Sequence, residues 1–294
     1  MDAPIANVTR KGAILTDGTI LTDEKVFTKS SSNENESFLN KIDHTFYTSQ
    51  DKKLCIYESL TNPPLCHNLG ATPLSINQYE NTLALLLSNN TLVLMDKPSG
   101  NILFLSKQKF VVAHTNEIAE ALFFNDLVIF PTLDGKIVIV NHQTKEEQKS
   151  FIVSNEKHFN NVTFLEKREA TIFAGNRHNL RAITPKANYK YEETFNAIRL
   201  IDDQIITVSN SGNIAILDKQ LTIMTEVKLP FAGILNISEF NNHFYFIERS
   251  GFLIQTDREL SNQKIYALSD SIEQPIYITD NTFYYQSRSL SFPK

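Results

Sequence analysis

The sequence lacks tryptophan entirely and has only two cysteines and three methionines in 294 residues. It also lacks long apolar runs, because the longest, Thr82–Leu87, has the length of a strand and not of a membrane-spanning helix. The N-terminus, Met1–Val8, has neither the basic region nor the apolar core of a signal peptide. These absences argue against membrane-spanning helices in the given sequence.

Basic stripes and nucleotide-binding motifs are missing as well. The formal net charge is -5, so we expect no nucleic-acid partner. There is no P-loop, no G-x-G-x-x-G and no G-x-S-x-G motif. What is present is a 41% hydrophobic content with 20 Phe and 10 Tyr, enough for a packed core and typical of strands.

The stretch Val208–Asp218 predicts two strands joined by a tight turn, since Asn-Ser-Gly-Asn tolerates positive φ between apolar runs. The same pattern recurs along the chain. Aligned on the first apolar residue after each turn, the copies are separated by 38, 45, 43, 34, 39 and 37 residues. The aligned residues are Leu54, Leu92, Ile137, Leu180, Ile214, Leu253 and Leu290. This period is typical of four-stranded propeller blades.

The repeats therefore predict an all-β fold, a single β-propeller domain over residues 1–294 with four-stranded antiparallel blades. We expect seven blades, at 37–70, 72–108, 119–153, 161–195, 197–230, 233–268 and 275–294. The last blade lacks a fourth strand, and we expect one of the closing strands in residues 1–30 to complete it. Gly18–Asp23 resembles a further repeat, so eight blades is the alternative. A β-sandwich with coincidental spacing is a second alternative.

The most polar stretch, Ser30–Ser37, has no side chains able to form a core, and we expect a flexible surface loop there.

Cys55 and Cys66 are placed on the third and fourth strands of the same predicted blade, nearly opposite each other across the turn. Cross-strand Cβ atoms lie close enough for a bridge after modest adjustment. We expect a disulfide and hence an oxidising compartment. The alternative is a pair of free thiols in the core of a cytosolic protein.

Few residues form a pattern typical of a catalytic, metal-binding or partner-binding site. The histidines show no metal-ligand spacing, and the paired carboxylates fall in predicted turns, so we expect no catalytic residue, no metal and no cofactor. Arg177, His178 and Arg181 cluster where the repeat is least regular. They are our candidate cationic contact for an acidic partner protein, and the alternative is an ordinary exposed turn.

The segment Asn90–Gly100 resembles the PQQ-like β-propeller repeat, and Gly135–Thr144 and Gly212–Asp218 are similar to it. This family contains quinoprotein dehydrogenases and BamB-like lipoproteins of outer-membrane protein assembly. Quinoprotein propellers use tryptophan docking motifs, and this sequence has no tryptophan. The resemblance is therefore nearer to the BamB-like branch.

That resemblance implies a non-catalytic, monomeric periplasmic scaffold that binds another protein in outer-membrane β-barrel protein assembly. It also implies tethering to the outer membrane through a lipid anchor that the given sequence does not include. Two alternatives remain, an accessory subunit of a periplasmic redox enzyme and a hydrolase with its site in a central cavity. Because one fold serves many functions, these expectations rest on analogy.

Overall fold

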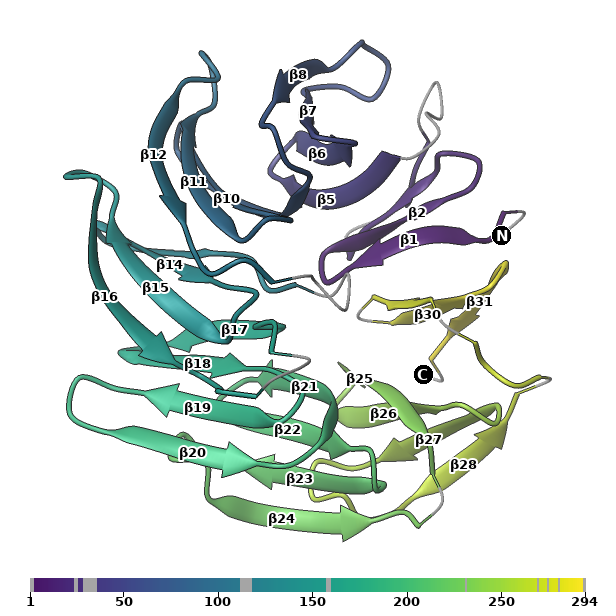
Figure 1. Cartoon of the computed structure of the whole chain (residues 1–294). Coiled ribbons are helices and arrows are strands. Elements are labelled where there is room, and N and C mark those ends of the chain that lie inside the picture. The colour runs from purple at the N-terminus through teal and green to yellow at the C-terminus, as the bar shows by residue number, and fades with distance from the viewer. Residues whose placement is uncertain are drawn as a thin grey trace. The chain divides into compact units, whose positions relative to one another are not determined.

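The computed structural model describes residues 3–23, 26–28, 36–111, 118–156, 160–230, 232–268, 270–273, 275–279 and 281–292. All regular elements in these ranges are strands, which form eight antiparallel sheets of consecutive strands (Figure 1). Seven sheets have four strands and the last has three. The predicted all-β propeller is confirmed, and the predicted number of seven blades is wrong: there are eight.

The chain forms two compact units, Ala6–Leu165 and Met1–Ile5 with Glu166–Lys294. The strands of the first four sheets are β1 (Ile5–Thr9), β2 (Gly12–Leu15), β3 (Ile20–Leu21), β4 (Val26–Phe27), β5 (Glu36–Ile42), β6 (Thr45–Gln50), β7 (Lys53–Tyr57), β8 (Leu65–Asn68), β9 (Pro73–Tyr79), β10 (Thr82–Leu87), β11 (Thr91–Asp96), β12 (Ile102–Lys107), β13 (Leu122–Phe124), β14 (Leu127–Pro131), β15 (Lys136–Asn141) and β16 (Glu146–Ile152).

The other four sheets follow in the same order along the chain. Their strands are β17 (Phe164–Arg168), β18 (Thr171–Gly175), β19 (Asn179–Ile183), β20 (Asn188–Glu192), β21 (Phe195–Ile201), β22 (Gln204–Ser209), β23 (Asn213–Leu217), β24 (Ile223–Lys228), β25 (Ile234–Phe240), β26 (His243–Glu248), β27 (Phe252–Thr256), β28 (Lys264–Ala267), β29 (Ile276–Ile278), β30 (Thr282–Tyr285) and β31 (Arg288–Ser291).

The additional blade is the first sheet, β1–β4, which the sequence-based count treated as closing strands. Its short strands carry apolar side chains that are buried in a hydrophobic cluster. Ile14 and Ile20 are buried and pack in one cluster with Phe38 and Phe46 of the next sheet. Burial of this apolar surface stabilises four strands as a sheet of their own.

The predicted completion of the last blade by an N-terminal strand is also wrong. The last sheet contains β29–β31, and β1–β4 pair with one another, so no described N-terminal strand joins it. A backbone hydrogen bond of 3.2 Å from Ile5 N to Gln286 O is nevertheless present.

The predicted polar loop Ser30–Ser37 is only partly within the described residues, because 30–35 lie outside them. Its last two residues are not a loop. Glu36 is buried and begins β5.

The core lies between neighbouring sheets, because side chains of a strand alternate between its two faces. On β11, Val93 and Met95 pack with Leu54 of β7, whereas Leu92 and Leu94 pack with Val138 of β15. In the other unit, Ile214 and Ile216 of β23 similarly pack against Ile254 of β27. The repeated apolar pattern of the sequence is thus the packing of sheet on sheet.

Candidate interaction surface

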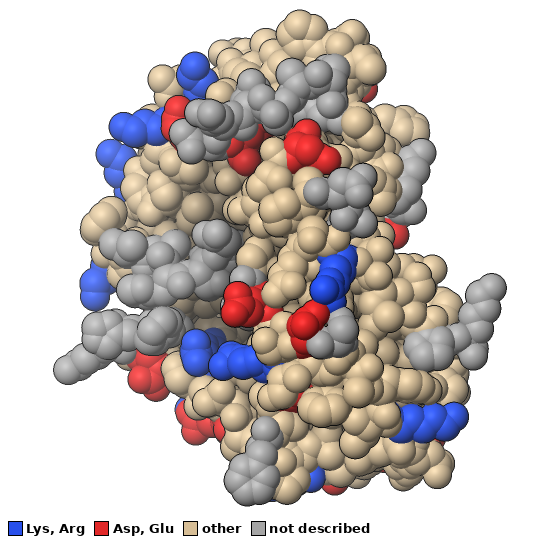
Figure 2. Space-filling view, turned by 90° about the vertical axis from the view of Figure 1, so that its right-hand side faces the viewer, with Lys and Arg blue, Asp and Glu red and all other residues tan. Residues whose placement is uncertain are grey.

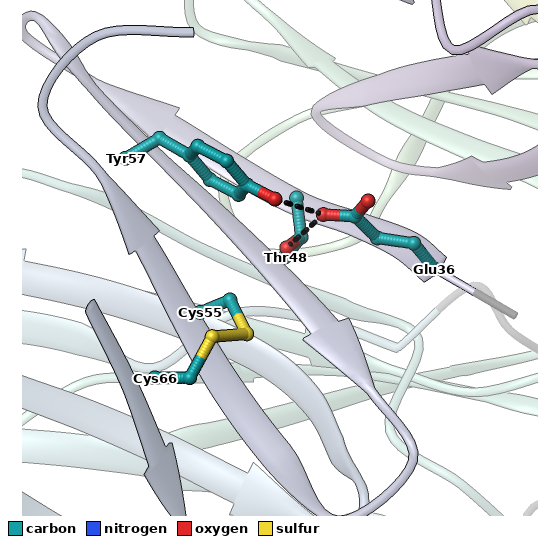
Figure 3. The surroundings of a disulfide bond; sticks show 5 residues. All are labelled: Glu36, Thr48, Cys55, Tyr57 and Cys66. Atoms are coloured by element: carbon teal, nitrogen blue, oxygen red, sulfur yellow. Dashed lines mark hydrogen bonds between the residues drawn. A yellow bond between two sulfur atoms is a disulfide. The ribbon is translucent and has the colours of Figure 1, made fainter. Parts of the chain in front are cut away.

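Cys55 on β7 and Cys66 on β8 form a disulfide (Figure 3). The two residues are direct partners in the antiparallel register, and their Cα atoms are 4.1 Å apart. Cys55 is buried against the first sheet, whereas Cys66 is exposed on the edge strand. The predicted disulfide is confirmed, and the alternative of two free thiols is excluded.

A buried carboxylate lies in the same sheet as this disulfide. Oε1 of Glu36 accepts a hydrogen bond of 2.6 Å from Thr48 Oγ1 and one of 3.0 Å from the Tyr57 hydroxyl (Figure 3). Two donors to one oxygen offset the desolvation of the acid. The contacts join the start of β5 to β6 and β7, so we assign Glu36 a structural role.

The candidate partner contact predicted from the sequence lies in the β18–β19 hairpin. Arg177 is exposed in the turn, where its carbonyl accepts a hydrogen bond of 2.7 Å from Phe195 N. His178 shares this turn and lies 3.5 Å, Nδ1 to Oγ1, from Thr194. Arg181 lies within β19, where partial burial lowers the pKa of its guanidinium. The structure therefore places Arg177 and His178 in one turn and Arg181 in the strand that follows; the contact itself stays a prediction.

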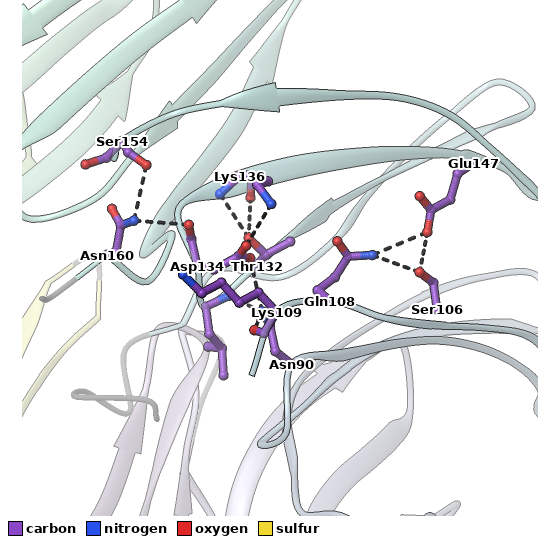
Figure 4. A network of polar contacts seen from close by, with 11 residues as sticks. Asn90, Ser106, Gln108, Lys109, Thr132, Asp134, Lys136, Glu147, Ser154 and Asn160 are labelled. Carbon is purple, nitrogen blue, oxygen red and sulfur yellow. Dashed lines mark hydrogen bonds and ion pairs between the residues drawn. The ribbon is translucent and has the colours of Figure 1, made fainter. Parts of the chain in front are cut away.

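A polar network joins the sheet β9–β12 to the sheet β13–β16 (Figure 4). Its centre is Asn90, which is fully buried in the β10–β11 turn. Nδ2 of Asn90 donates to Lys109 O at 2.7 Å and to Asp134 Oδ1 at 3.0 Å, while its Oδ1 accepts from Leu133 N at 2.9 Å. These hydrogen bonds connect the β10–β11 turn of one sheet to the β14–β15 turn of the next, which indicates a structural role.

Asp134 is the charged member of this network. Burial alone would raise the pKa of its carboxyl, but hydrogen bonds from Lys136, Asn90 and Thr132 outweigh burial and hold that pKa below its usual value. Lys136 Nζ lies 2.9 Å from Asp134 Oδ2. Its contacts with Lys136 and Thr132 of its own sheet and with Asn90 of the neighbouring one make Asp134 part of the link between the two sheets.

A second link between these sheets involves β12 (Figure 4). Ser106 Oγ and Gln108 Nε2 both donate hydrogen bonds to Oε1 of Glu147 on β16. One face of β12 is therefore occupied by the next sheet.

The outer edge of β12 carries a concentration of exposed apolar side chains. Ile102 is 48% exposed, Leu103 37% and Leu105 48%. We call these three residues the β12 edge surface. Phe110, which follows the strand, is 70% exposed. An exposed apolar patch on a polar molecule is typical of a binding surface. Sequence reasoning missed it, although an uncharged run at the fourth strand of a blade is a signal that could have found it.

Neither metal ligands nor charge points to another site in the part of the chain that is described. No group of three or more His, Cys, Asp or Glu side chains there could hold a metal ion. No described helix is long and apolar enough to span a bilayer. On the face that Figure 2 shows, acidic and basic residues are intermingled among uncharged ones. The exposed apolar side chains of β12 therefore indicate a binding surface more specifically than the distribution of charge does.

Comparison with known proteins supports the fold and gives two relatives. No family model matches the chain. Plasminogen-binding protein PgbB of Helicobacter pylori, from strain J99 and from strain 26695, is 24% identical over 98% of the chain. The chain spans 63% of the length of these curated relatives.

Solved structures share the architecture at low sequence identity. BamB from Moraxella catarrhalis gives a TM-score of 0.72 at 13% identity, covering 97% of this chain and 92% of that one. The C-terminal WD40 domain of Sif2 gives 0.70 at 12% identity, covering 99% and 97%. These likenesses show the β-propeller fold alone.

Proposed function

We propose that this chain is a non-catalytic, protein-binding β-propeller of the periplasm. The observation that carries the proposal is the β12 edge surface, where three large apolar side chains are exposed on one edge strand. Exposure of this apolar area to water is unfavourable, and a bound protein would remove the cost. The Cys55–Cys66 disulfide supports an oxidising compartment, since such bonds persist there and are rare in the cytosol.

The proposed partner is a component of outer-membrane β-barrel protein assembly. The support is the fold shared with BamB and the resemblance of the repeats to that branch. At 13% identity this is an analogy of fold, and the partner must be identified by its binding.

A second candidate function is plasminogen binding. It is supported by the relatives named for that activity, which align with nearly the whole chain. It would place the same propeller on the cell surface or in a released form, where the disulfide would equally persist.

One capture experiment and one direct titration separate these candidates. The tagged full chain is used to capture proteins from solubilised cell envelopes, with a designed propeller of unrelated sequence as the control. Enrichment of an outer-membrane assembly β-barrel protein supports the first candidate, and enrichment of a periplasmic reductase supports an accessory role in redox instead. Purified plasminogen is titrated by biolayer interferometry; saturable binding in the absence of envelope partners favours the second. If neither measurement shows binding above the control, the protein-binding proposal is wrong.

A further inference from the structure

The β12 strand is the free edge of its sheet. The strand order is β12-β11-β10-β9, so β12 pairs with β11 on one side only. A free edge offers unpaired backbone N–H and C=O groups that a further strand can bond.

The outward-pointing residues of β12 follow from its register. Gln108 N donates to Asn90 O at 3.0 Å, and backbone groups alternate in direction along an antiparallel strand. Ser106 and Phe104 therefore bond to β11. Leu105 and Lys107 direct their N–H and C=O groups away from the sheet, where a fifth strand would meet them.

The apolar side chains of the edge share one face. Leu105 lies opposite Val93, and Ile102 lies opposite Met95, with a bulge at the position of Leu103 between them. Val93 and Met95 both belong to the buried cluster shared with β7. Side chains of an added strand would extend this core outward and cover Leu105 and Ile102.

The edge position held by Leu105 is polar in three of the six other blades that have a fourth strand described. Its equivalents are Ser150 on β16, Lys190 on β20 and Glu226 on β24, each opposite the matching residue of its neighbour strand. Charged residues on an edge strand prevent pairing with other chains. On the other three the equivalent is Val26 of β4, the disulfide-bonded Cys66 of β8 and Ile265 of β28, which follows Lys264. From Ile102 to Ser106, β12 has no charged residue.

Two basic residues follow the apolar part of this edge, both on its C-terminal side. Lys107 and Lys109 are exposed, and neither amino group has an ion pair within the described ranges. An acidic group on an added strand would complement them at this end. Charge therefore selects among extended segments that fit the apolar face.

We propose that β12 binds an extended, alternating apolar segment of a partner protein as a fifth strand, with acidic residues of that segment facing Lys107 and Lys109. This inference rests on the proposed protein-binding function and adds the surface and the chemistry of the partner. The backbone bonds supply affinity that depends little on sequence, and the side chains at Leu105 and Ile102 supply selectivity.

The test uses the full chain and a fluorescent eight-residue peptide of alternating valine and threonine with an aspartate at each end. Fluorescence anisotropy measures its binding. Leu105→Pro removes the outward N–H and is tolerated at an edge, so we expect at least tenfold weaker binding. Ser150→Pro, at the equivalent position of β16, is the matched control and leaves affinity unchanged. Lys107→Glu combined with Lys109→Glu reverses the preference from the aspartate peptide to one with lysines at its ends.

Urea midpoints establish that the variants are folded; should Leu105→Pro fail to fold, Leu105→Lys replaces it and is expected to weaken binding as strongly. Absence of saturable binding to the wild type, or equal binding by the Leu105 and Ser150 variants, overturns the inference. Equal capture of an envelope protein by wild type and Leu105→Pro also overturns it and leaves the proposed function intact. Peptide binding with neither a captured envelope protein nor plasminogen binding sustains the edge site and contradicts the proposed function.

Discussion

Asn90 and Asp134 belong to neighbouring sheets and share a hydrogen bond of 3.0 Å between Nδ2 and Oδ1. Forty-four residues separate them in sequence, and both lie in turns between the second and third strands of their blades. The pair joins two blades through side chains that the repeat pattern does not share. The stability of the unit Ala6–Leu165 should therefore depend on it.

Asn90→Ala is expected to lower the free energy of unfolding by about 2–4 kcal/mol. The substitution removes the Asn90 acceptor of the Leu133 N–H and the Asn90 donor to the Lys109 carbonyl, and it places alanine at a φ of 60°. Asn89→Ala is the matched control, because Oδ1 of Asn89 accepts no hydrogen bond within the described residues. Urea unfolding measures both, and similar losses for the two variants would contradict the role of Asn90.

The lowered pKa of Asp134 predicts a pH dependence of stability. An acid whose pKa is lower in the folded state stabilises the protein above the unfolded pKa, near 3.9, and loses this contribution as pH falls through the folded pKa. Asp134→Asn should therefore lower the unfolding free energy at pH 6 and approach the wild type as pH falls below 4. Urea titrations between pH 2.5 and 6 measure the difference, and a difference independent of pH would refute this assignment.

The sequence predicted the packing of strands better than the links between blades. The residues aligned in the repeats, such as Leu92 and Ile214, are buried because a period of strand, turn and strand places each of them on a sheet face. The Cys55–Cys66 pairing was predictable because both cysteines lie in one hairpin, where counting from the turn gives the register. Local information was sufficient for these features.

The first blade and the binding surface were less accessible to sequence reasoning. Ile20 lies in a strand of two residues, too short to show an alternating pattern. The Asn90–Asp134 bond joins two different blades, and no spacing rule indicates which polar residues will meet. Leu105 is exposed because β12 is an edge strand. Predicting this exposure requires the order of strands in the sheet and not only their positions in the sequence.

Substitution of Gly212 is expected to destabilise the fold through both backbone strain and a steric clash. It has a φ of 79°, and a Cβ atom there would lie 2.2 Å from the carbonyl oxygen of Leu229. Gly212→Ala should therefore cost about 2–3 kcal/mol. Gly70→Ala separates the two causes, since Gly70 has a φ of 75° but nothing within 4 Å of its Cβ position, and should cost about 1 kcal/mol. Equal thermal midpoints for the two variants would show that the collision is relieved at no cost.

The Cys55–Cys66 bond predicts a redox dependence of stability. The bond closes a loop whose ends are 11 residues apart, and the loss of this constraint on the unfolded chain corresponds to about 3 kcal/mol. Cys55→Ala combined with Cys66→Ser should lower the free energy of unfolding by that amount in urea. Reductant should destabilise the wild type to a similar extent and leave the variant unchanged, which serves as the control. Labelling of both thiols in native, unreduced protein would show that the bond is absent and would remove the support for an oxidising compartment.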